Sequence, residues 1–218
     1  MAEATGHNAY FGLSACHAAL LTNEETFEYG DVIDIGELGG IIEIALDAQT
    51  SNDPSYATDR VWIDSESDNG FEGTMRIANV WGHPELRKFF AAACGYEFAA
   101  DGTLLGTANG KRVPFALMSQ SSGNLEDKRI CYLKVQAGKP GKNQQTKEDG
   151  STLQADEFPI TVRAVKLPSG WTGSFYENIP ADGKPYTEFF DAVRTDLEPA
   201  AAQQGGAGEG NGEGNGEG

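Results

Sequence analysis

Residues 64–68 have types and spacing that approach a calcium site. Asp64, Glu66 and Asp68 alternate as the oxygen ligands of a calcium-binding loop do. However, Asn69 stands where such a loop needs glycine, and Met75 stands where it needs a bidentate glutamate. A calcium-dependent binding module in this region therefore ranks as the third hypothesis for the function of the chain.

Residues 106–112, GTANGKR, approach a phosphate-binding loop. There is one residue too few between the two glycines, and Arg112 stands where a serine or threonine would bind Mg²⁺. The Asn109–Gly110 pair instead predicts a hairpin turn, because both residue types tolerate positive φ.

The remaining reactive residues do not form a recognisable set. Cys16 and His17 are adjacent, so a strand would point them to opposite faces. With Cys94 and Cys131 the cysteines are odd in number and scattered, which favours a reducing compartment over a disulfide framework. There is no GxSxG motif and no evident Ser, His, Asp triad. We therefore expect a protein that is not an enzyme and that needs no metal or other cofactor.

Length and charge restrict the possibilities further. The chain has 218 residues, enough for one domain with a substantial core or for at most two small ones, and a formal net charge of −17. Tight binding to free nucleic acid is not expected, because affinity for the phosphate backbone comes from cations. The N-terminus lacks a signal-peptide pattern, and the longest apolar run, residues 89–94, is far too short for a membrane helix, so no membrane anchor is expected.

Charge is also segregated along the chain. Residues 23–72 contain 14 acidic side chains and one base, whereas residues 111–147 contain eight bases and two acids. One monomer could bring the two segments together or solvate both. Alternatively, acidic and basic surfaces of different copies could meet in an assembly, where complementary charge sets register and excludes wrong partners.

The stretch from residue 59 to 98 predicts a hairpin. Residues 60–64 are rich in Val, Trp and Ile, and residues 71–80 alternate apolar and polar side chains as a half-buried strand does. Asn69 and Gly70 lie between them and predict the connecting turn. Gly73 lies on the apolar face of the second strand.

A short amphipathic helix is expected over residues 84–93. Phe89 and Phe90 recur with other apolar residues at helical spacing, Pro84 suits the first helical position and Gly95 the end. Such a helix needs a sheet to cover.

The rest of the chain predicts mostly strands. They are expected at residues 10–22, 26–29, 41–46, 112–118, 128–135 and 158–165, with a glycine-punctuated bend at 36–40, long polar loops at 48–58 and 138–152, and a second short helix at 185–193. We therefore predict a mainly β (α+β) fold, an antiparallel β-sandwich or half-barrel with one flanking short helix and a C-terminal short helix. Residues 1–196 would form this domain, and residues 197–218 a flexible, acidic, Gly-rich tail.

The ordered set of landmarks over residues 10–195 resembles the major tail proteins, or tail tube proteins, of long-tailed, non-contractile bacteriophages. The resemblance rests on YFGL at residues 10–13, DNGFEGT at 68–74, the helix at 84–93, RICY at 129–132, GKP at 138–140, TKED at 146–149, TVRA at 161–164 and FFDAV at 189–193. The chain departs from the family in its closing helix, where Tyr186 and Phe189 stand and a tryptophan is common, and in its acidic glycine tail.

The resemblance implies a structural virion protein. Six copies would form a ring, and stacked rings would form the tube through which genomic DNA passes without tight binding during genome delivery. Other tail proteins would bind at the tube ends, and the protein would assemble in the host cytoplasm and reside in the virion tail. An acidic bore is physically sensible, because like charge keeps the phosphate backbone from binding.

The long loop at 138–152 is expected to contact a neighbouring subunit through Lys139, Lys142 and Lys147, since loops of this length are usually functional or disordered. The alternative function is another β-sandwich virion component, such as a capsid decoration or an adhesion module.

Overall fold

The structure is a computed structural model that describes residues 10–57, 60–123, 127–141 and 155–199; of residues 10–11, 50–57, 60–69 and 122–123 it describes the backbone alone. Its centre is one large antiparallel sheet in the order β2-β1-β8-β9-β10-β5-β4, with β13 also paired to β9 and β3 to β1. These strands are β1 (Tyr10–Asn23), β2 (Glu28–Tyr29), β3 (Ile33–Asp34), β4 (Ile41–Ala57), β5 (Arg60–Ile77), β8 (Phe115–Gly123), β9 (Arg129–Ala137), β10 (Asp156–Val162) and β13 (Phe175–Asn178).

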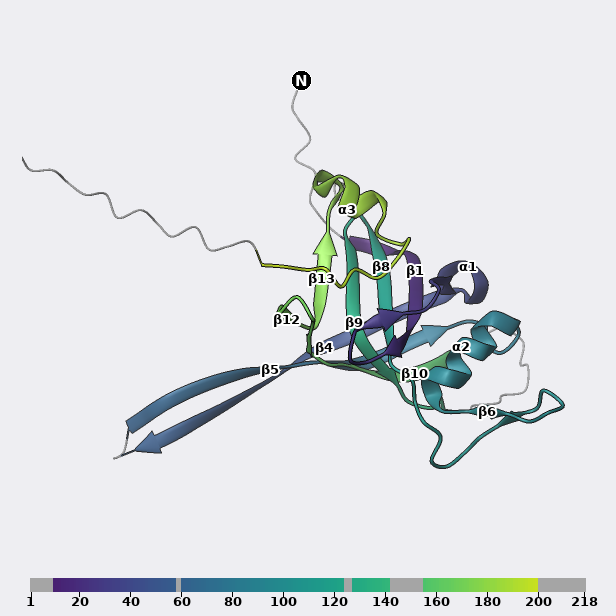
Figure 1. Ribbon diagram of the computed structural model, residues 1–218, viewed down its shortest axis with the longest axis horizontal. Helices are drawn as coiled ribbons and strands as arrows, with labels where there is room; N and C mark the ends of the chain where they lie inside the picture. Colours follow the sequence, from purple (N-terminus) through teal and green to yellow (C-terminus); the bar gives the residue numbers. More distant parts are fainter. Residues whose placement is uncertain (1–9, 58–59, 124–126, 142–154, 200–218) are drawn as a thin grey trace, which may run out of the picture.

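Two small sheets and a few short helices complete the described chain. Strands β6 (Glu97–Phe98) and β7 (Leu104–Leu105) pair with each other, as do β11 (Val165–Lys166) and β12 (Thr172–Gly173). The helices are α1 (Ile35–Gly39), α2 (Pro84–Cys94), the 3-10 turn η1 (Pro180–Asp182) and α3 (Lys184–Thr187). The sheet is strongly twisted, with β8 and β9 upright and β4 and β5 running across the view in Figure 1. The expectation of a mainly β, antiparallel fold with a flanking short helix is confirmed, and the described strands do not close into a barrel.

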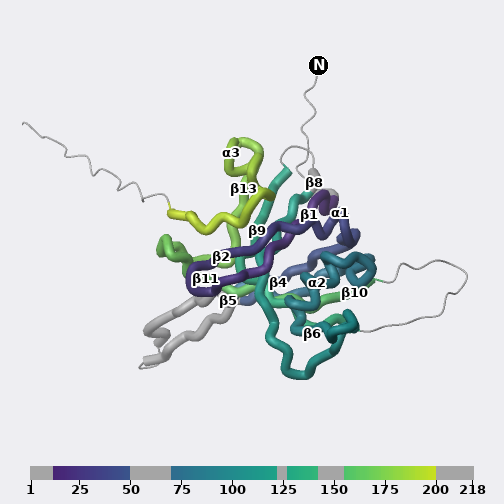
Figure 2. The backbone as a smooth tube through the Cα atoms, turned by 45° about the vertical axis from the view of Figure 1, so that its right-hand side comes forward, coloured from purple at the N-terminus to yellow at the C-terminus, as the bar shows by residue number. Residues whose placement is uncertain are grey.

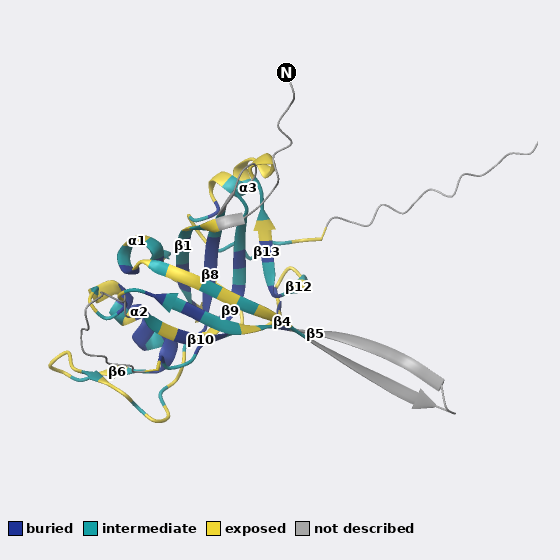
Figure 3. Cartoon of the chain, turned by 180° about the vertical axis from the view of Figure 1, so that it is seen from behind, coloured by how far each residue is buried: buried dark blue, intermediate teal, exposed yellow. Residues whose placement is uncertain are grey.

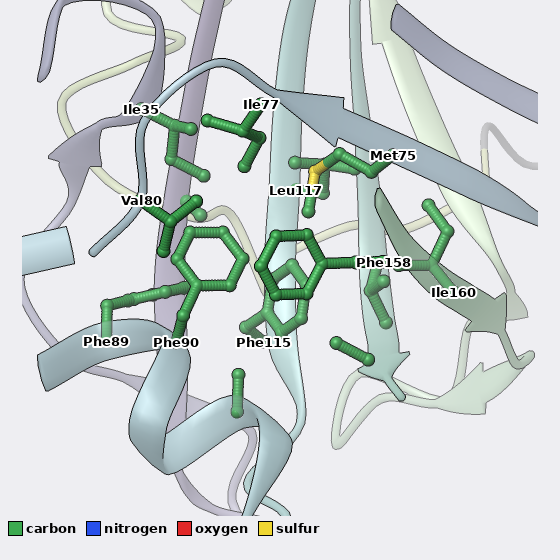
Figure 4. Packing of buried hydrophobic residues seen from close by; sticks show 14 of the residues in the cluster. Ile35, Met75, Ile77, Val80, Phe89, Phe90, Phe115, Leu117, Phe158 and Ile160 are labelled. Atoms are coloured by element: carbon green, nitrogen blue, oxygen red, sulfur yellow. The ribbon is translucent and has the colours of Figure 1, made fainter. Parts of the chain in front are cut away.

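Helix α2 forms where the sequence predicts it. Pro84 begins the helix, where its missing N–H costs nothing, and Gly95 ends it in the left-handed conformation with φ of 70°. Phe89 and Phe90 are buried against the sheet. Their rings lie 5.4 Å from Phe115 and 4.7 Å from Phe158, respectively, and Figure 4 shows this packing. The helix therefore closes the larger hydrophobic core.

A second core lies on the other face of β8 and β9. A bulge in β9 makes both cores possible: Leu117 pairs with Tyr132 and Phe115 with Val135, so β9 has one extra residue between these pairs. The extra residue switches the face of β9, so that Leu133 joins the second core and Val135 the first. The C-terminal segment covers the second core with Phe189, Val165, Leu167 and Tyr176.

The prediction of a hairpin turn at Asn69–Gly70 is wrong. Strand β5 continues through both residues, which form a β-bulge, because Ala48 pairs with Phe71 while Thr50 pairs with Asp68. Gly70 does adopt a positive φ of 88°. Glycine is therefore favoured at this position, as in the predicted turn, but it serves a bulge within a strand.

The prediction of a surface loop at residues 48–58 is also wrong, because β4 extends to Ala57 and pairs with β5 as far as Arg60. Pro54 lies within β4 opposite Asp64. A proline is tolerated there because β4 is an edge strand, and one side of an edge strand has no strand partner.

Three smaller predictions need correction. The turn at Asn109–Gly110 exists but does not join a hairpin, since β7 pairs with β6 and β8 pairs with β1 and β9. The bend at residues 36–40 is helix α1, which Asp34 caps at its start. The helix expected at 185–193 is one turn, α3, followed by turns in which Phe189 is buried with its ring 5.5 Å from that of Tyr176.

Candidate functional site: assembly surfaces

The three cysteine thiols are poor nucleophiles. Cys16, Cys94 and Cys131 are all buried and unpaired. Burial raises the pKa of each thiol to about 12, and for Cys94 it outweighs the opposite effect of Arg112 and Lys139. These side chains therefore act as small core residues, and Cys94 also donates a hydrogen bond to the carbonyl oxygen of Gly138 at 3.3 Å.

His17 and Asp34 form the described pair closest to a catalytic arrangement, with 3.4 Å between Nε2 and Oδ2. The imidazole stacks on the ring of Phe190 at 4.2 Å. Its Nδ1 is buried and has no hydrogen-bond partner among the described atoms, so no described nucleophile is in reach. Burial lowers the pKa of His17, against the raising effect of Asp34, and Arg129 lowers it further. The pair joins β1 to β3, and the stacking of His17 on Phe190 joins β1 to the C-terminal segment.

A cavity of about 390 Å³ lies between the two ends of the twisted sheet. Gly12 and Leu13 of β1, Glu43, Ile44 and Leu46 of β4, Ser119 of β8 and Tyr132 of β9 line it. Glu43 is the one carboxylate of this lining, and Arg76 pairs with it at 3.4 Å. The described residues also contain no cluster of three or more His, Cys, Asp or Glu side chains that could hold a metal ion.

Lys139 is held by its own chain. Its ammonium group donates a hydrogen bond to the carbonyl oxygen of Thr107 and lies 5.0 Å from the centre of the Tyr96 ring. Lys142 and Lys147 lie outside the described residues, so their contact with a neighbouring subunit stays a prediction. The three lysines are therefore not brought together by the described structure.

Gly70 and Gly73 hold the backbone of β5 close to its neighbours. A Cβ atom on Gly70 would lie 2.1 Å from the carbonyl oxygen of Val162, and one on Gly73 would lie 1.9 Å from that of Ala45. Both glycines therefore have a structural role in the sheet. Asn69 shares the bulge with Gly70.

The feature best suited to assembly is the outer part of β4 and β5. Strand β10 pairs with β5 only over residues 71–77, whereas β4 pairs with β5 out to the Ala57–Arg60 pair. From Thr50 and Asp68 outward, the two strands pair only with each other among the described strands, as the ribbon in Figure 1 shows. We call residues 50–57 and 60–68 the arm.

Strand β4 also leaves one edge of the sheet unpaired by any other described strand. Its side chains over residues 41–49 are exposed or half-buried, in contrast to the buried β8 and β9 in Figure 3. Ile42 is 40% exposed on this strand. Glu43 and Asp47 place charge there, which limits unspecific strand pairing.

Comparison with models of protein families and with curated proteins finds no match to this chain. None of the described helices is long and apolar enough to cross a membrane. The resemblance to tail tube proteins therefore rests only on the sequence landmarks over residues 10–195 given above. The arm is the candidate assembly element that the sequence did not predict; the β-propensity of residues 60–63 and 71–77 was the available signal.

Proposed function

We propose that this protein is a structural, self-assembling subunit of a virion tail tube, in which stacked hexameric rings conduct DNA. The arm is the single observation that carries the proposal. An isolated two-stranded hairpin is marginally stable in water, so an arm that pairs with no other described strand needs another surface to bind. A neighbouring copy supplies such a surface at the high concentration within an assembly.

The unpaired edge of β4 supports the same proposal. An edge strand presents a row of backbone donors and acceptors that can pair with another chain. In a ring of identical subunits this edge would be covered, which removes the aggregation hazard of an open sheet. The acidic balance of the chain would let DNA pass, because a surface of the same sign as the phosphates offers no tight binding site.

Shortening the arm tests this function. Residues 51–67 are replaced by Asn-Gly, which joins the paired residues Thr50 and Asp68 by a two-residue hairpin turn. We expect the monomer to keep its melting temperature, because both hydrophobic cores remain, and its circular dichroism spectrum to lose only the strand signal of the arm. We expect tubes to be lost from electron micrographs. Removal of residues 200–218, a stretch of similar length at the chain end, is the matched control and should leave tubes intact. Tubes of normal width from the armless variant would contradict the proposal.

A further inference from the structure

The described surface around α2 and the β6–β7 hairpin combines exposed apolar side chains with cations that have no carboxylate partner among the described side chains. Phe98 and Leu105, on β6 and β7, are 42% and 45% exposed. They account for two of the three large apolar side chains that stand out as exposed among the described residues. The hairpin forms a sheet of its own and projects beside α2, as Figure 1 shows.

Five cations on α2 and on segments next to the hairpin have no carboxylate partner among the described side chains. They are Arg87 and Lys88 on α2, Lys111 and Arg112 between β7 and β8, and Lys139, which contacts Thr107 and the Tyr96 ring. Arg87 donates a hydrogen bond to the carbonyl oxygen of Gly102 and lies over the ring of Phe98, 5.4 Å from its centre. The same region has the acids Glu85, Glu97 and Asp101, so it is locally net positive in a chain of net charge −17. We call the residues Arg87, Phe98, Leu105, Lys111 and Arg112 the basic–apolar surface.

The turn between β1 and β2 has the opposite character. Glu24 and Glu25 lie in this turn, Glu28 lies on β2 and Asp31 lies just after β2; all four are exposed, and residues 23–31 contain no base. Lys134 pairs with Glu24 at 3.6 Å, while the other three carboxylates have no cation partner among the described side chains. We call these four residues the acidic turn.

The acidic turn has a defined shape. Asn23 accepts hydrogen bonds from the backbone N–H groups of Glu25 and Thr26 at 2.9 and 3.3 Å. Phe27 adopts a positive φ of 53° and packs against the second core, which anchors the turn. The carboxylates are therefore presented from a fixed backbone, which lowers the entropy lost on binding.

We infer that the basic–apolar surface binds the acidic turn of a second copy of this chain. Strand β2, which carries Glu28 of the acidic turn, and strand β6, which carries Phe98 of the basic–apolar surface, lie on opposite sides of β9 in Figure 2, so one copy can use both surfaces at once. Contact between two different surfaces is heterologous and closes into a ring where the rotation permits. Phe98 and Leu105 would lose water at the centre, and the cations would select the acidic partner. The inference deepens the proposed function, on which it rests, by naming the surfaces that meet.

Two charge-reversal variants test the inference. Lys111→Glu with Arg112→Glu makes the basic–apolar surface acidic, and Glu25→Lys with Glu28→Lys makes the acidic turn basic. We expect each variant alone to associate roughly tenfold or more weakly in sedimentation velocity. An equimolar mixture should regain association, because every contact in an alternating assembly then joins opposite charges. Lys166→Glu with Lys184→Glu gives the same charge change as the Lys111, Arg112 variant at exposed sites elsewhere, and should associate as the wild type does.

The outcomes separate this inference from the proposed function. If both charge-reversal variants still form tubes like those of the wild type, the inference is overturned and the proposed function stands. Association that falls in each variant and returns in the mixture, without tubes in micrographs, would support the inference and overturn the function. A wild type that stays monomeric at all concentrations would overturn both. Salt-sensitive binding of duplex DNA that is lost in the Lys111, Arg112 variant would show that this surface serves nucleic acid and would also overturn the inference.

Discussion

The backbone of Gly73 in β5 passes so close to Ala45 in β4 that a Cβ atom on Gly73 would lie 1.9 Å from the carbonyl oxygen of Ala45. No side chain fits between them unless the two paired strands move apart. We expect Gly73→Ala to lower the free energy of unfolding by about 3 kcal/mol or more, as overpacking against backbone does. Urea denaturation measures this change. Gly141→Ala is the control, because nothing lies within 4 Å of a Cβ at that site; equal stability of the two variants would refute the close approach.

Phe90 tests the larger core. Its side chain is fully buried and lies against Phe89 and Phe158. Phe90→Ala should cost about 3–5 kcal/mol, because it removes buried apolar surface and leaves a cavity. Lys88→Ala, on the exposed side of the same helix, should change stability by no more than about 0.5 kcal/mol. A small effect at Phe90 in thermal or urea unfolding would mean that α2 does not cover the sheet.

Helix α2 could be predicted from sequence because its signals are local. Proline at the start, glycine at the end and apolar residues at helical spacing all agree within one segment. The arm could not be predicted, because Asn69–Gly70 satisfies a turn and a bulge equally well. Which of them forms depends on pairing with residues 48–50, and that is a tertiary relation.

The surfaces proposed for assembly could be predicted only in part. The sequence shows that charge is segregated along the chain, but it does not show which charged side chains pair with each other in the folded protein. Lys134 and Lys139 are both engaged within the chain, whereas Lys111 and Arg112 remain exposed and unpaired among the described side chains. The sequence also did not reveal that Cys131 and Leu133 face one core and Val135 the other, because the bulge in β9 breaks the alternation after Leu133.

The cysteine thiols should resist alkylation in the native protein. With a pKa of about 12, roughly one thiol in ten thousand is a thiolate at pH 8. Iodoacetamide at that pH should leave Cys16, Cys94 and Cys131 unmodified for hours, and should label all of them in urea. Mass spectrometry counts the modified residues. Rapid labelling of the native protein would contradict their burial.

Protonation of His17 at acidic pH should destabilise the fold. Its folded-state pKa is lowered below the ordinary value of 6.5, chiefly by burial, so the unfolded chain binds the proton more readily. The stabilising contribution of the neutral imidazole is therefore present above pH 6.5 and is lost as the pH falls through the folded-state pKa. An NMR titration should show the His17 ring protonating below pH 6.5, and Asp34→Asn should shift that titration lower still. A midpoint above 6.5 would contradict the account.

Electron microscopy of the purified full chain, over a range of concentrations, tests the central claim most directly. An open-edged subunit with an arm and two complementary surfaces should assemble into tubes of uniform width with a regular axial repeat. Monodisperse monomers or trimers at the highest concentration would contradict assembly into a tube and would favour a capsid decoration or adhesion module instead.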